Sequence, residues 1–208
     1  MNRAGTNEKA QYMATYNAFA AVSRAMVGLI EDYCPQSLLL NPEFKLYHAV
    51  DYEHPMNEGF SLCLYHVSIN ASRRNFPPRR SIDGRRYRPS LPVDLHYLLT
   101  PWAVDPERQQ RMLGWSMRFL EDLGTLPAGL LNHYIKETDT FRADEAVDIV
   151  CDPLALTDYL NLWDKLKPKK ETSVTYAVRM VLLDSVIESP EFGPVQTREL
   201  QTGEVVTP

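Results

Sequence analysis

The chain has 208 residues, of which 44% are hydrophobic and 24% are charged, and its formal net charge is −5. That length and apolar content suffice for one domain with a buried core and do not favour two large domains. No stretch approaches the ~20 apolar residues of a membrane span, so we expect no membrane partner. Three widely spaced cysteines without a C-x-x-C pair indicate a reduced protein made in a cytoplasm, with neither a disulfide framework nor a zinc site.

The first part of the chain predicts one helix and two strands. Apolar residues recur every three or four positions over about residues 8–33, which is typical of an amphipathic helix. Alternating patterns predict strands at 44–50 and 60–69. Both faces of the second strand are largely apolar, so we expect it to lie centrally in a sheet.

The next elements are marked by helix caps. Strict alternation predicts a strand at 91–100. Asp105 is then a good N-cap, Pro106 suits the first turn of a helix, and Gly124 ends the apolar stripe of that helix.

The last elements follow the same rules. A short strand is predicted at 147–151, and Thr157 is expected to cap a helix that Pro168 ends. Alternation then predicts a final strand at 173–183.

This order of elements predicts an α+β domain with a single mixed β-sheet of about four to five strands flanked by helices. We expect residues 1–186 to form the domain, with an extended loop at 71–90. Residues 187–208 are rich in proline and poor in large apolar side chains, so we expect an extended C-terminal tail with no core of its own.

Little in the sequence indicates catalysis. Asp94 and His96 are two residues apart on one predicted strand, so both should project from the same face, and such a pair could orient a general base. A nucleophile in a recognisable motif is missing, and the usual environment of such residues is a polar sheet face. The five histidines lack metal-ligand spacing, and no glycine-rich phosphate loop occurs, so we expect no metal and no cofactor.

The sharpest feature is an arginine-rich stretch. Residues 73–89 read RRNFPPRRSIDGRRYRP, with no lysine and one acid. The stretch carries +6 within a chain of net charge −5, so the remaining chain carries −11. The guanidinium group pairs bidentately with carboxylate or phosphate, so exclusive use of arginine favours a contact surface. Its seven arginines are Arg73, Arg74, Arg79, Arg80, Arg85, Arg86 and Arg88.

Three interpretations of this stretch remain open. A run of charge is often a solvated loop, and the local prolines and glycine fit that interpretation. Phe76 and Tyr87, interleaved with arginines, fit a module that binds nucleic acid or another polyanion. A protein partner with an acidic rim fits equally well, because the acidic remainder of the chain would repel a polyanion.

Five segments in chain order resemble the tail-terminator, or cap, proteins of extracellular contractile injection systems, which are phage-tail-like particles of the anti-feeding and virulence-cassette types. The most specific match is the strand LPVDLHYLLT followed by a D-P-E helix. The segments are LCLYHVSIN (62–70), RNFPP (74–78), LPVDLHYLLTPWAVDPERQQRMLGWSMRFL (91–120), LTDYLNLWDKL (156–166) and SVTYAVRMVLL (173–183).

The resemblance implies a phage tail-terminator-like fold and a structural, non-enzymatic role in fixing particle length. It implies a ring of six copies on the last ring of inner tube and contractile sheath, with no small-molecule substrate and no role for nucleic acid. Such a protein is made in the bacterial cytoplasm and built into the particle. We hypothesise that the seven arginines meet carboxylates of the tube or of a neighbouring subunit, and that the tail adds a strand to an exposed sheet edge. The tail residues of that hypothesis are Phe192, Val195 and Leu200.

Two other classes stay open beside this one. A module that binds nucleic acid through the arginines is the main alternative. A hydrolase built on Asp94 and His96 is a weaker one.

Overall fold

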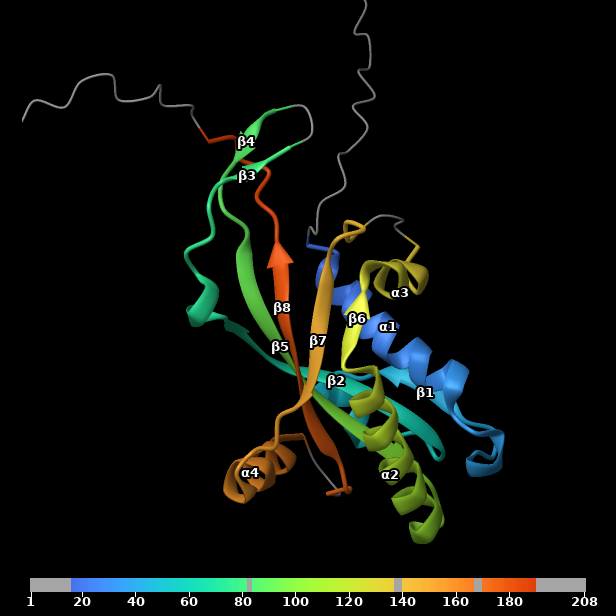
Figure 1. The fold of residues 1–208 in the computed structure, drawn as a ribbon. Coiled ribbons are helices and arrows are strands. Elements are labelled where there is room, and N and C mark those ends of the chain that lie inside the picture. Colours follow the sequence, from blue (N-terminus) through green and yellow to red (C-terminus); the bar gives the residue numbers. More distant parts are fainter. Residues whose placement is uncertain (1–15, 82–83, 137–139, 167–169, 190–208) are drawn as a thin grey trace, which may run out of the picture.

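The computed structural model describes residues 16–81, 84–136, 140–166 and 170–189. Its main feature is a six-stranded sheet with strand order β1-β2-β5-β8-β7-β6, beside a two-stranded sheet of β3 and β4 (Figure 1). Only β1 and β2 are parallel neighbours, so the sheet is mixed. The strands are β1 Glu43–Leu46, β2 Gly59–Ile69, β3 Arg79–Arg80, β4 Arg86–Tyr87, β5 Leu91–Trp102, β6 Thr125–Pro127, β7 Ala146–Cys151 and β8 Val174–Leu183.

The α+β class with one mixed sheet and flanking helices is confirmed, but the sheet has six strands because the three-residue strand β6 adds an edge. β2 is an interior strand, as expected, although β5 and β8 occupy the middle of the sheet. The helices are α1 Ala18–Tyr33, α2 Pro106–Leu123, α3 Ala128–His133 and α4 Leu156–Leu166, with short 3-10 turns η1 Gln36–Leu38, η2 Ala49–Glu53 and η3 Ala71–Arg73.

Several predicted boundaries were wrong. The first helix begins at Ala18, and Tyr16 and Asn17 form a turn before it, while the earlier part of the predicted helix lies outside the described residues. The strand predicted at 44–50 stops early, because the chain turns into η2 after β1. Thr157 lies inside α4 and does not cap it.

The helix after β5 forms as its caps predict. The Asp105 carboxylate accepts a hydrogen bond from the Arg108 backbone N–H at 2.9 Å, and Pro106 follows at the first helical position. Gly124 ends α2 with φ 58, a left-handed conformation that glycine adopts without strain.

Two clusters of buried side chains cover the two faces of the sheet. On one face α1, α2 and α3 pack over the central strands, where Leu95, Tyr97 and Leu99 on β5 are fully buried. The Tyr97 hydroxyl is 2.8 Å from the Ser23 hydroxyl on α1, so the polar tip of this buried ring is hydrogen-bonded. On the other face η2 and α4 cover a smaller aromatic cluster at one end of the sheet, formed by Tyr47, Tyr52, Met56, Cys63, Leu98, Trp102, Trp163 and Leu166.

The opposite end of the sheet has a different construction. β7 pairs with β8 only from Asp148 opposite Arg179 to Cys151 opposite Tyr176, and beyond Arg179 the two strands diverge. β5 and β8 continue together and lead into β3 and β4, which lie at the far end of the molecule from α2 and α4 (Figure 1).

Candidate docking surface

The arginine-rich stretch folds into a small ribbon that projects from the sheet. β3 and β4 pair as an antiparallel hairpin, and the chain returns after β8 to add residues 187–189 beside β4. Arg88 N–H donates to the Ile187 carbonyl at 3.0 Å, and Ser189 N–H donates to the Arg86 carbonyl at 2.8 Å. We call β3, β4, Arg88 and residues 187–189 the arginine ribbon. Its backbone is therefore ordered by hydrogen bonds and is not a simple solvated loop.

Asp184 lies at the base of the arginine ribbon with a side chain that has no exposed surface. The Ser90 hydroxyl donates to its carboxylate at 2.5 Å, and Arg142 Nη1 donates at 3.3 Å. Arg79 Nε lies 3.5 Å from the same carboxylate, as an ion pair. One buried carboxylate thus joins β3, the start of β5 and the loop before β7.

Arg79 is held on a second side by an aromatic ring. Its guanidinium carbon lies 4.8 Å from the centre of the Tyr87 ring, and its side chain is only 13% exposed. A cation over a ring face is attracted by the ring quadrupole. Arg79 is therefore largely committed to contacts within its own chain.

The other arginines of the stretch differ in exposure. Arg85 Nη1 pairs with the Glu188 carboxylate at 3.3 Å, which ties the hairpin to the returning segment. Arg86 is half-buried. Five of the seven predicted docking arginines are exposed: Arg73, Arg74, Arg80, Arg85 and Arg88. The predicted tail residues Phe192, Val195 and Leu200 lie outside the described residues.

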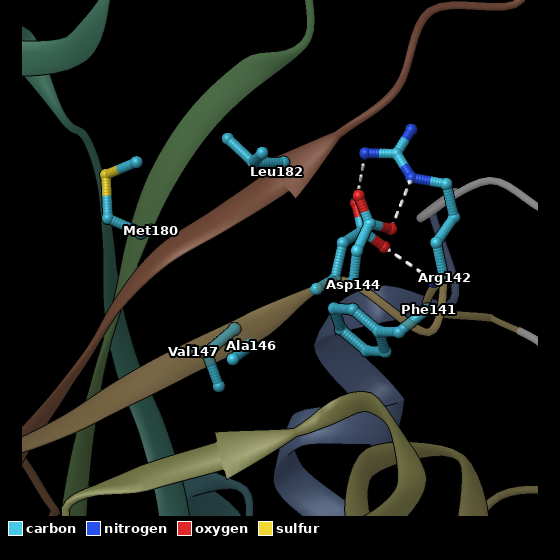
Figure 2. Close-up of a pocket in the computed structure, with 8 residues that line it drawn as sticks. Phe141, Arg142, Asp144, Ala146, Val147, Met180 and Leu182 are labelled. Atoms are coloured by element: carbon cyan, nitrogen blue, oxygen red, sulfur yellow. Dashed lines mark hydrogen bonds and ion pairs between the residues drawn. The ribbon is translucent and has the colours of Figure 1, made fainter. Parts of the chain in front are cut away.

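A hollow of about 220 Å³ opens where β7 and β8 diverge. Figure 2 shows Arg142 reaching over Asp144 from the loop before β7, with Val147 on β7 and Met180 on β8. Arg142 pairs with Glu145 at 2.9 Å and with Asp144 at 3.5 Å, besides Asp184. Burial raises the pKa of the Glu145 carboxyl, and the backbone N–H and guanidinium of Arg142 act in the opposite direction. The polar side of this hollow is lined by Arg142, Asp144 and Glu145, and Arg142 forms ion pairs with both acids.

The Asp94 and His96 pair does not form. Asp94 accepts hydrogen bonds from Asn70 Nδ2 and, at 3.0 Å, from the backbone N–H of Met180. Met180 has a left-handed φ of 65 at an irregularity in the pairing of β5 with β8, so Asp94 stabilises a distorted backbone. His96 Nε2 instead lies 3.0 Å from the Ser68 hydroxyl.

The other ring nitrogen of His96, Nδ1, lies 3.4 Å from the carboxylate oxygen Oδ2 of Asp152. Ser68, His96 and Asp152 thus lie in the order of a hydrolase triad. The His96–Asp152 distance is too long for the hydrogen bond that fixes the imidazole tautomer in such triads, and the Asp152 side chain is 38% exposed. The group fits a hydrogen-bonded polar sheet face better than a catalytic site.

Other site classes have little support in the part of the chain that the structure describes. Within it, no group of three or more His, Cys, Asp or Glu is placed to hold a metal ion. Its helices are also too short or too polar to cross a membrane. All three cysteines are free, and burial raises the pKa of the Cys34 thiol to about 11.

Solved structures share this fold. The sheath/tube terminator of a PVC extracellular contractile injection system, in its extended state, aligns with a TM-score of 0.56 and 16% identity over 90% of this chain and 64% of that chain. The tube-terminating cap of the anti-feeding prophage, AFP, aligns with a TM-score of 0.54 and 15% identity over 85% of this chain and 60% of that chain. The chain therefore spans less than two thirds of either protein, and its fold is of the tail-terminator class.

Residues 21–197 match the family described as the Pvc16 N-terminal domain, and the chain belongs to that family. The resemblance seen in the sequence is thereby confirmed at the level of family and fold. The match extends eight residues past Ser189, the last residue that the structure describes. A search of curated proteins found no match.

Proposed function

We propose that this protein is a structural cap that terminates the inner tube and contractile sheath of a phage-tail-like contractile injection particle and so fixes its length. The observation that carries the proposal is the shared fold with a sheath/tube terminator over 90% of the chain, together with membership of the Pvc16 N-terminal domain family. It acts through binding, without catalysis, in a particle assembled in a bacterial cytoplasm.

The cap works as a ring of six copies that contacts tube and sheath subunits. Rings that stack need complementary patches, because charge pairs across an interface set register and exclude wrong partners. The arginine ribbon supplies one such patch, and its exposed cations are candidates for contact with carboxylates of the tube or of a neighbouring copy. The tail that follows the ribbon, with Phe192, Val195 and Leu200, is a second candidate contact.

The proposal is tested with particles made without this protein. We expect tubes and sheaths of variable length in electron micrographs. When the wild-type protein is supplied, the particles should again have a narrow length distribution. A narrow length distribution in its absence would contradict the proposal.

The tail has its own test. Removing residues 190–208 keeps the pairing of residues 187–189 with β4, so we expect the melting temperature to change little. Retention of the cap on the sheath should fall. Unchanged retention would exclude the tail as a contact.

Binding of nucleic acid is the second candidate, favoured by the arginine content. The structure weakens one part of it, since Arg79 covers a face of the Tyr87 ring that a base would need for stacking. This candidate predicts affinity for duplex DNA that falls steeply with salt, with a log–log slope of about −0.9 per phosphate contact. The proposed cap function predicts no binding of duplex DNA at physiological salt.

A further inference from the structure

The arginine ribbon depends on the rest of the molecule for its position. Each of its two strands has only two residues, and a hairpin of this size has little stability of its own in water. Three segments connect it to the sheet: residues 70–78 after β2, the segment that enters β5 and the segment that leaves β8. Asp184 lies on the segment that leaves β8 and accepts a hydrogen bond from Ser90 on the segment that enters β5.

The contacts of Asp184 fix the direction of the arginine ribbon. Arg79 reaches the carboxylate from β3, and Arg142 reaches it from the loop before β7, so one anion faces two cations from separate elements. Loss of that anion would take away the carboxylate that faces the largely buried Arg79 guanidinium, whereas Arg142 would keep Glu145 and Asp144 as ion-pair partners. The charge of Asp184 is therefore needed to keep the arginine ribbon against the sheet.

The arginines divide into an inward and an outward group. Arg79 and Arg80 are neighbours on a strand, so their side chains point to opposite faces. Arg79 is covered by Asp184 and Tyr87, whereas Arg80 and Arg88 are exposed. The outward face is thus cationic, and its orientation is set by the inward one.

The outward face fits a protein surface rich in carboxylates. Arginine pairs bidentately with carboxylate, and neighbouring arginines held in fixed positions recognise a fixed arrangement of acids. Pre-ordering of such groups lowers the entropic cost of binding. A nucleic acid would instead use free aromatic faces, and one face of Tyr87 is already occupied.

Resting on the proposed function, we propose that Asp184 is the positioning residue of a pre-formed cationic surface. The outward arginines of this surface, Arg80 and Arg88, dock on a carboxylate-rich surface of another subunit of the particle. Asp184 and Arg79 make no contact with the partner. They hold the ribbon in the orientation that docking requires.

The test measures binding of the full-length protein to particles produced without it, at several salt concentrations around the physiological ~0.15 M. Asp184→Asn keeps the shape of the side chain and leaves the outward arginines in place. We expect it to weaken binding about tenfold through lost pre-ordering, while the dependence of affinity on salt stays that of the wild type. Arg80→Gln combined with Arg88→Gln should weaken binding and also flatten the salt dependence, because it removes charge pairs from the interface.

The control is Arg111→Gln, since Arg111 is an exposed arginine on α2 that pairs only with Glu107 among the contacts described. It should bind as the wild type does. Melting temperatures within a few degrees of the wild type show that each variant is folded. If Asp184→Asn unfolds the protein, Arg79→Gln serves in its place, with the same expected result.

The possible failures are distinguishable. If wild-type protein does not bind the uncapped particles, the proposed function is wrong. If wild-type protein binds and folded Asp184→Asn binds equally well, the positioning role is wrong and the cap function stands. If the double arginine variant binds equally well, or duplex DNA competes with the particles at physiological salt, the carboxylate-rich partner is excluded.

Discussion

The helix-covered sheet and the arginine ribbon are held in place by different forces. In the sheet, β5 buries Leu95, Tyr97 and Leu99 completely beneath helices, so burial of apolar surface supplies the stability. In the ribbon, two short strands are joined to the sheet by ion pairs and hydrogen bonds of one carboxylate, Asp184. Changes to the ribbon should therefore alter binding without unfolding the sheet.

The largest expected effect is loss of packing in the sheet. Leu95→Ala removes a fully buried side chain, and we expect the free energy of unfolding to fall by about 3 kcal/mol. Leu91→Ala is the matched control on the same strand, at a position that is 40% exposed, and should cost about 1 kcal/mol or less. Chemical denaturation followed by circular dichroism measures both. Similar losses of unfolding free energy in the two variants would show that the stability of the sheet does not depend on this core.

A smaller, local effect is expected at the base of the arginine ribbon. Arg79→Gln removes one cation of the buried ion pairs, although Asp184 keeps Arg142 and Ser90 as partners. We expect the ribbon to be destabilised by about 1–2 kcal/mol, which should speed hydrogen exchange at the Arg88 and Ser189 amides about tenfold.

Arg80→Gln is the control, because the neighbouring arginine is exposed. It should leave exchange at those two amides unchanged. If Arg79→Gln and Arg80→Gln have the same effect, the assignment of inward and outward arginines fails.

The smallest expected effect concerns the pH dependence of one buried thiol. Cys34 is the C-cap residue of α1 and is buried. Burial disfavours its thiolate, so the pKa of the Cys34 thiol is raised from 9.0 to about 11. Since the raised pKa favours the neutral thiol, the associated stability is present at neutral pH and is lost as the pH rises through about 11. The rate at which iodoacetamide alkylates Cys34 should keep rising up to that pH. A rate that levels off near pH 9 would show that this end of the core is open to water.

The regular parts of the fold were predictable because their signals are local. β5 carries apolar residues at every second position from Leu91 to Leu99, and α2 has a capping acid, a first-turn proline and a terminal glycine. The strand β6 and the helix α3 were missed because three and six residues are too few to show a period. Thr157 looked like a cap because threonine often is one, but the helix already begins at Leu156.

The candidate surface was predictable only in part. The sequence shows seven arginines together, but it does not distinguish Arg79 from Arg80. That distinction depends on Asp184, which is 94 residues from Ser90 and 42 from Arg142 along the chain. No local pattern marks such a residue. In the same way, the pairing of His96 with Ser68 depends on the alignment of β2 with β5, which the sequence spacing of Asp94 and His96 could not indicate.

The most direct test is a cryo-electron microscopy reconstruction of the end of an assembled particle that contains this protein. We predict six copies in a ring on the last tube and sheath layer, with Arg80 and Arg88 of each copy within ion-pair distance of carboxylates on another chain. A ring whose arginine ribbons face only solvent, or particle ends without this protein, would contradict the account.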